Sequence, residues 1–198
     1  MANNSLVTLA LVALVVSVVA AGYSYVASNN VMTGFATSII NLTVESSASI
    51  NFTTATIQFG SGRVNDGAAN ATLNTVTNSV GNSNFTANNA GLVLENIGNV
   101  NVSLVLGCTS NSTALFGGTN PQYLWNVSNV EANSCADTAQ NITFGSWVNA
   151  NTTMRVCERF GYANSADSLR IDVYLVVPSD SSTGYKSDTI TATATATG

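Results

Sequence analysis

Apolar residues follow two different patterns along this chain. Ser5–Ala27 is an almost unbroken apolar stretch, and from Leu6 to Gly22 it holds no charge and only two hydroxyls, those of Thr8 and Ser17. This length is close to the roughly 17–25 residues with which a helix crosses a hydrocarbon layer. Further along, apolar residues recur at every second position, as in half-buried β-strands. The pattern predicts one long N-terminal apolar α-helix followed by a mainly β domain.

Small residues recur every three or four positions in the apolar stretch. On a helix they lie along one stripe, where a second apolar helix can approach closely. The alternative is that Ala and Ser are simply common in any apolar stretch. We interpret the stretch as an assembly helix whose contact residues are Leu6, Leu9, Ala10, Val12, Ala13, Val16, Ser17, Val19 and Ala20.

Three fates are open to this stretch: a removed signal peptide, a membrane anchor, or a helix buried among copies of itself. Basic residues precede the apolar part of a secretory signal and orient membrane helices, but the first Lys or Arg of this chain is Arg63. This favours a retained helix from which a charged leader has already been removed. Two small-residue motifs, 19–21 and 25–27, fit a cleavage site, so a removed signal remains the alternative.

Near residue 36 the spacing of apolar residues changes from helical to every second position. This change predicts an apolar helix over 1–35 and a β domain over 36–198. Trp125 and Trp147 are expected in its core. Strands are expected near 40–44, 50–52, 57–59, 91–95, 100–106, 123–127, 142–148, 153–159, 169–177 and 185–195. Many short strands separated by turn signals predict an immunoglobulin-like antiparallel β-sandwich. We expect the Thr- and Ala-rich last strand to form a hairpin with 169–177; an exposed sheet edge is the alternative.

The composition excludes several classes of function. Charged residues make up 8% of the chain, the net charge is −5 and His is absent. Nucleic-acid binding is therefore not expected, because it needs a basic patch. The commonest general base and metal ligand is missing as well. Asp180 and Asp188 flank one turn and could bind calcium through oxygen, but a solvated turn is the preferred interpretation. We predict no enzyme, no catalytic residues, no cofactor and no metal.

Polarity comes instead from Asn, Ser and Thr, which form ten N-x-S/T sequons. A surface with few charges and many acceptors is what a heavily N-glycosylated extracellular protein shows. Asn-rich turns without sugar are the alternative. Asn3 adjoins the apolar stretch and is left out of the predicted sites, which are Asn41, Asn51, Asn70, Asn84, Asn101, Asn111, Asn126, Asn141 and Asn151.

The cysteines are Cys108, Cys135 and Cys157. Outside the cell a disulfide is expected, and the odd number leaves one thiol over. The sequence does not determine the pairing. We prefer Cys108 with Cys135, which would join the end of a strand to the loop after it.

An apolar helix without Lys or Arg, Leu6–Ala27, followed by one sequon-rich β domain over 36–198, resembles the archaeal type IV pilin and archaeal flagellin class of filament subunits. The resemblance implies a removed leader, helices packed in the filament core and β domains on the outer surface. Ser5 stands where many pilins carry Glu. The C-terminal unit Leu169–Thr197 is similar to the closing hairpin of TasA-like subunits, which polymerise by donating a strand.

The predicted function is a structural subunit of an extracellular, cell-surface filament of pilus type. Its partner would be the chain itself, with the membrane as its location before assembly and N-glycans as its covalent additions. Two alternatives stay open: a strand-donating TasA-like subunit with a removed signal peptide, and a membrane-anchored surface domain that binds a partner through its loops.

Overall fold

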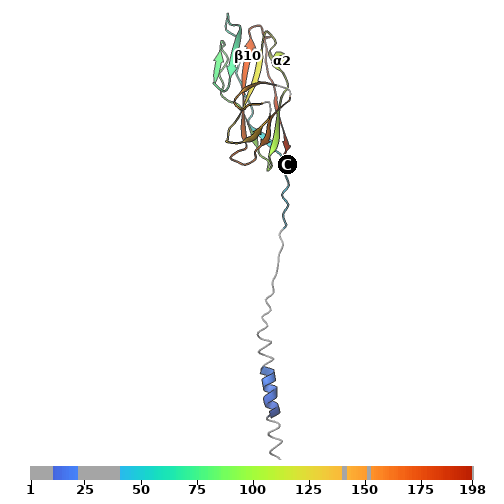
Figure 1. Ribbon diagram of the computed structural model, residues 1–198. Coiled ribbons are helices and arrows are strands. Elements are labelled where there is room, and N and C mark those ends of the chain that lie inside the picture. The colour runs from blue at the N-terminus through green and yellow to red at the C-terminus, as the bar shows by residue number, and fades with distance from the viewer. Residues whose placement is uncertain (1–10, 22–40, 140–141, 151–152, 198) are drawn as a thin grey trace, which may run out of the picture. The chain divides into compact units, whose positions relative to one another are not determined.

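The computed structural model describes residues 11–21, 41–139, 142–150 and 153–197. The chain divides into two units, Met1–Thr43 and Val44–Gly198, and each is described by itself (Figure 1). In the first unit, residues 11–21 form an α-helix. The predicted boundary at 35/36 lies outside the described residues.

The second unit is mainly β, with two antiparallel sheets among its described residues. The seven-stranded sheet has the order β1-β4-β10-β2-β3, with β6 on the other side of β10 and β8 beside β6. Its strands are β1 (Ile50–Thr54), β2 (Asn70–Asn74), β3 (Ser79–Gly81), β4 (Leu92–Asn96), β6 (Gln122–Asn129), β8 (Trp147–Asn149) and β10 (Ser168–Pro178).

The four-stranded sheet has the order β11-β5-β9-β7. Its strands are β5 (Val102–Cys108), β7 (Cys135–Thr138), β9 (Met154–Phe160) and β11 (Ile190–Ala196), and the short helix α2 (Ser112–Phe116) follows β5. One core cluster contains buried residues of both sheets, among them Leu94, Leu104, Trp125 and Phe160. The architecture is therefore β-sandwich-like, as the alternating pattern predicts.

Strand β10, labelled in Figure 1, pairs with three other strands of the seven-stranded sheet. Leu169 and Ile171 point into the core with no exposed surface, which confirms the strand predicted at 169–177. One edge of β10 pairs with β6. The other edge pairs with β4 at Ser168–Ile171 and with β2 at Tyr174–Pro178. Both edges of β10 are thus occupied by other strands.

The predicted hairpin between β10 and the last strand is wrong. β11 belongs to the other sheet, where Ile190 lies opposite Cys108 and Ala196 opposite Val102. Because both edges of β10 are already paired, the chain after Pro178 crosses to the second sheet before β11 begins. The alternative prediction, a strand at a sheet edge, is confirmed.

Strands β4 and β5 belong to different sheets although only five residues separate them. The buried Asn96 organises this crossing: its Nδ2 donates to the carbonyl of Val100 at 3.0 Å, and its Oδ1 accepts from the amide of Gly98 at 3.1 Å. A side chain at Gly98 would collide with the backbone carbonyl of Ser47. The connection therefore needs both the amide and the glycine.

Several predicted strands are shorter than expected or absent. Residues 41–49 form no strand, and Leu42 and Val44 are exposed. Alternation alone did not produce a strand there, because none of the described strands pairs with these residues. Residues 55–60 are also not a strand, although the carbonyl of Phe59 accepts from the amide of Thr86 at 2.9 Å.

Other elements differ in extent. Of the strand predicted at 142–148 only β8 forms, after a turn in which the amide of Ser146 donates to the carbonyl of Thr143. The last strand begins at Ile190 rather than near 185. The short elements β7 and α2 are not signalled by the sequence pattern.

The two tryptophans lie in different surroundings. Trp125 is completely buried in the core, as predicted. Trp147 is half-buried on β8, and its ring is tilted against that of Tyr174, with the centroids 5.6 Å apart. Because Trp147 pairs with Asn126, and Trp125 with Val148, alternation places the two rings on opposite faces of the sheet.

Candidate functional site

The described helix, residues 11–21, is apolar on every side. Its Leu and Val side chains are all exposed: Leu11, Val12, Leu14, Val15, Val16, Val18 and Val19 each keep 55–65% of their surface accessible. An ordinary surface helix buries one apolar stripe and presents polar residues on the opposite face. These residues have no polar face, so the helix has apolar surface to bury in every direction.

Ser17 is the only polar side chain in this helix, and its hydroxyl donates to the carbonyl of Leu14 at 2.8 Å. An internally bonded hydroxyl can enter an apolar environment without losing a hydrogen bond. Ala13, Ser17 and Ala20 are spaced four and three positions apart, so they share one stripe. Leu6, Leu9 and Ala10 of the predicted assembly helix lie outside the described residues.

In the part of the chain that the structure describes, no helix combines the length and the apolar character needed to cross a membrane.

A second candidate surface is the outer edge of β11. Among the described strands, β11 is hydrogen-bonded to β5 alone and so ends its sheet. The amide of Thr197 donates to the carbonyl of Asn101, and the amide of Thr109 to that of Thr189. In an antiparallel pair the bonded positions alternate. The odd-numbered residues of β11 therefore face β5, and the even-numbered ones direct their amides and carbonyls away from the sheet.

This edge differs from the other described sheet edges. β11 keeps one register over seven residues, from Ile190 to Ala196, and contains neither a charge nor a proline. At the opposite edge, β7 has four residues and two register shifts, and its Asp137 pairs with Arg159. β1 is interrupted by a register shift, and β3 and β8 have three residues each. Bulges, charges and short length are the usual protections of sheet edges, and β11 has none of them.

The structure describes seven of the nine predicted glycosylation sites; Asn141 and Asn151 lie outside the described residues. Asn41, Asn51, Asn84 and Asn111 are exposed, and Asn70 and Asn101 are half-buried. Two of the exposed residues already use their side-chain oxygen: Asn111 caps α2 by accepting from Ala114, and Asn84 accepts from the amide of Arg63. These contacts do not involve the nitrogen to which a glycan is attached.

Asn126 does not suit the predicted role. It lies within β6, between Asp172 of β10 and Trp147 of β8, and is only 7% exposed. A glycan on its nitrogen would have to leave through these neighbouring strands, so we withdraw Asn126 from the predicted sites. The N-x-S motif contains no information on burial, and the sequence could not have distinguished this site.

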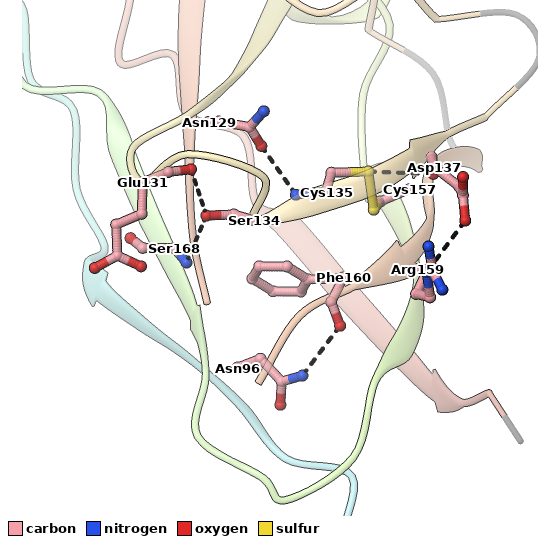
Figure 2. The surroundings of a disulfide bond; sticks show 10 residues. All are labelled: Asn96, Asn129, Glu131, Ser134, Cys135, Asp137, Cys157, Arg159, Phe160 and Ser168. Carbon is pink, nitrogen blue, oxygen red and sulfur yellow. Dashed lines mark hydrogen bonds and ion pairs between the residues drawn. A yellow bond between two sulfur atoms is a disulfide. The ribbon is translucent and has the colours of Figure 1, made fainter. Parts of the chain in front are cut away.

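The predicted pairing of Cys108 with Cys135 is wrong. The disulfide joins Cys135 of β7 to Cys157 of β9, whose Cα atoms are 5.9 Å apart (Figure 2). β9 lies between β7 and β5, which ends at Cys108. Strands two places apart in a sheet are separated by roughly 9–10 Å, which exceeds the reach of a disulfide. The amide of Cys135 donates to Asn129 Oδ1 at 3.0 Å, which orients the start of β7.

Cys108 is a free, buried thiol. Burial raises the pKa of its thiol above the ordinary value of 9.0, and the nearby carboxylate of Asp188 acts in the same direction. Burial likewise raises the pKa of Tyr123. Since the thiolate is the reactive form of cysteine, the environment of Cys108 disfavours nucleophilic chemistry.

A buried ion pair lies where β4 and β2 separate along β10. Arg170 Nε and Asp172 Oδ2 are 2.8 Å apart, and the Asp172 side chain is 5% exposed. Thr75 Oγ1 donates to Asp172 Oδ1 at 2.7 Å, and the hydrogen bond from Arg170 to Asp172 raises the pKa of the guanidinium. A Cβ at Gly91 would lie 2.7 Å from Arg170 Nε. The carboxylate of Asp172 is bonded on both oxygens by Arg170 and Thr75, so the role of this pair is structural.

Asp180 and Asp188, which flank one turn, each bind a different part of the loop after β5. Asp180 accepts from both the amide and the hydroxyl of Thr119, at 2.9 and 2.8 Å. Asp188 accepts from the amide of Ser110 at 2.8 Å and from the hydroxyl of Thr109. Each carboxylate thus orders a loop. Within 11–21, 41–139, 142–150 and 153–197, no group of three or more His, Cys, Asp or Glu is placed to hold a metal ion.

No protein-family model, curated protein or solved structure matches this chain.

Proposed function

We propose that the protein is a structural subunit of an extracellular filament of the archaeal type IV pilin kind. Its N-terminal helices would bundle in the core, and its immunoglobulin-like β domain would form the outer surface. The observation that carries the proposal is the helix of residues 11–21, which is apolar on all sides and keeps 55–65% of the surface of each Leu and Val side chain accessible. Such a helix requires an apolar environment, and copies of itself supply one.

The energy available supports assembly. Removing one Val or Leu side chain from water stabilises by about 1.5–3 kcal/mol, and the described helix presents seven such side chains. The stripe of Ala13, Ser17 and Ala20 permits close packing of helix backbones. Small contacts of this kind, repeated along a fibre, favour the polymer over the monomer.

An extracellular location and N-glycans remain part of the proposal. The disulfide between Cys135 and Cys157 supports the location, because disulfides persist in oxidising compartments. The exposed sequon residues Asn41, Asn51, Asn84 and Asn111 support glycosylation.

The test is Val16→Asp in the full chain, with filaments counted by negative-stain electron microscopy. An unpaired carboxylate inside an apolar bundle is strongly unfavourable, so this variant should yield no filaments. Val76→Asp is the matched control: Val76 is 51% exposed in the turn after β2, and its replacement should leave assembly unchanged. Filaments of normal length and yield from Val16→Asp would refute the proposal.

A second candidate is the strand-donating subunit, which the unprotected edge of β11 favours because strand donation needs an acceptor edge. Under this candidate, the mature protein begins after the apolar stretch. Intact-mass spectrometry of the native protein separates the two candidates, since a mature start near Gly22 or Ser28 would remove the helix that bundling needs and favour strand donation.

A further inference from the structure

The outer edge of β11 is complementary to a second copy of itself. Its outward hydrogen-bonding groups belong to Ile190, Ala192, Ala194 and Ala196, as the bonding of its odd-numbered residues to β5 requires. In an antiparallel pair, residues with outward groups must lie opposite one another. Pairing Ala192 with Ala194 satisfies this condition for both copies at once.

We propose that β11 pairs antiparallel with β11 of a second copy, with Thr193 opposite Thr193. This register also places Ile190 opposite Ala196 and Thr191 opposite Thr195. The half-buried Ala192 and Ala194 stay on the core side of the joined sheet, while Thr191, Thr193 and Thr195 stay on its solvent side. No side chain changes face, so the fold of each copy is preserved.

The side chains of β11 favour a second copy as the occupant. Thr–Thr pairs on neighbouring strands are stabilising, whereas like charges directly opposite one another destabilise. An antiparallel self-pair places the residue on its two-fold axis opposite its own copy, so a charge there would face an identical charge; β11 has no charge in its seven residues. Its small Ala and Thr side chains also let two identical strands pair edge to edge without steric conflict.

The symmetry of this contact indicates what it would do between filaments. A two-fold pair is isologous and closes after two copies, whereas a growing polar fibre needs a head-to-tail contact. The β11 pair therefore cannot be the repeating contact of a filament. Resting on the proposed function, it would instead join two filaments side by side.

Cysteine cross-linking tests the pair and its register in the full chain, held in detergent so that filament formation is not required. Thr193→Cys places two thiols at a non-hydrogen-bonded position, where Cα atoms lie about 4.5 Å apart, within disulfide reach. Mild oxidation should give a dimer on a non-reducing gel. Thr191→Cys alone should not, because it faces Thr195, and Thr191→Cys with Thr195→Cys should.

The outcomes are decisive because all three positions are exposed and lie outside the core. Absence of a dimer from Thr193→Cys overturns the proposal, as does equal dimer formation by Thr191→Cys. Absence of the Thr193→Cys dimer would assign the edge of β11 to another occupant, such as a donated strand. Circular dichroism of each variant verifies that the β domain is folded.

Proline substitution gives an independent measurement on filaments. Ala194→Pro removes an amide that points away from the sheet, which an edge strand tolerates. We expect single filaments to form but their lateral bundles to disappear in electron micrographs. Thr193→Pro, one residue earlier, removes an amide that faces β5 and should destabilise the domain instead. Unchanged lateral bundling of Ala194→Pro filaments would overturn the proposal. The separate question of whether filaments form at all is tested by Val16→Asp.

Discussion

Arg170 holds Asp172 by two hydrogen bonds although the two residues are neighbours on the same face of one strand. Its Nε donates to Oδ2 and its terminal nitrogen to Oδ1, both at 2.8 Å. The pair fills the fork where β4 and β2 separate along β10, and Thr75 Oγ1 donates to the same carboxylate. The amide of Val173 in turn donates to Thr75 Oγ1 at 3.0 Å. Together with the backbone bond from the amide of Thr75 to the carbonyl of Val173, this network joins β10 to the residue that follows β2.

We therefore predict that Asp172→Ala is strongly destabilising. Removing one partner of a buried ion pair leaves the other charge uncompensated and typically costs about 3–5 kcal/mol. The partial exposure of Arg170 places the expected loss near the lower end of this range. The matched control is Asp137→Ala, whose pair with Arg159 is exposed and should contribute about 0–1 kcal/mol. Urea unfolding curves measure the free energy of unfolding of both variants. Equal losses of stability would contradict the structural role of the pair between Arg170 and Asp172.

The disulfide gives a second prediction. Cys135 and Cys157 are separated by 22 positions in the chain, and closing a loop of this length stabilises by about 3 kcal/mol in the chain-entropy description. Cys157→Ser should lower the free energy of unfolding by about this amount. Cys108→Ser is the comparison variant, because it leaves the bridge in place.

Peptide mapping without reduction measures the pairing directly. The wild-type chain and Cys108→Ser should both give a linked pair of peptides containing residues 135 and 157. A linked pair containing Cys108 would contradict the strand order of the four-stranded sheet.

Two acidic residues should titrate on opposite sides of the ordinary Asp value of 3.8. Hydrogen bonds from the amide and hydroxyl of Thr119 lower the pKa of Asp180, so its contribution to stability is present above 3.8 and lost as pH falls through the folded-state pKa. Burial and the neighbouring Glu131 raise the pKa of Asp167. Its contribution is therefore greatest below 3.8 and lost as pH rises through the folded-state pKa.

Carboxyl-carbon NMR of the labelled full chain measures both midpoints. Thr119→Val removes the hydroxyl donor to Asp180 and keeps the amide donor. The titration midpoint of Asp180 should therefore move upward, toward 3.8, while the midpoint of Asp167 stays unchanged. An Asp180 midpoint above 3.8 in the wild-type chain would contradict the hydrogen bonds described.

Burial should decide which sequons carry a glycan. If the native protein is glycosylated, peptides containing the exposed Asn51 should carry sugar and those containing Asn126 should not. Both residues lie within strands of the same sheet, so their comparison separates accessibility from secondary structure. Glycopeptide mass spectrometry of native material is the measurement, and a sugar on Asn126 would contradict its placement between β8 and β10.

Local pattern predicted the elements that bury one complete face. β10 was predicted because Leu169, Ile171 and Val173 alternate with polar residues and pack in the core. The pattern failed at the strand predicted near 40–44, where Leu42 and Val44 alternate equally well but pair with none of the described strands. Short elements such as β7 were missed because four residues hold too little alternation to stand out.

The sequence alone determined that the chain contains an uncharged apolar helix and a β domain with alternating strands, because both follow from the spacing of apolar residues. Only the tertiary structure decided which strands are neighbours. That arrangement excluded Cys108 from the disulfide, buried Asn126, and left β11 at an edge rather than beside β10. The reason is physical: alternation assigns each residue to a face, whereas strand order depends on contacts between segments far apart in the chain.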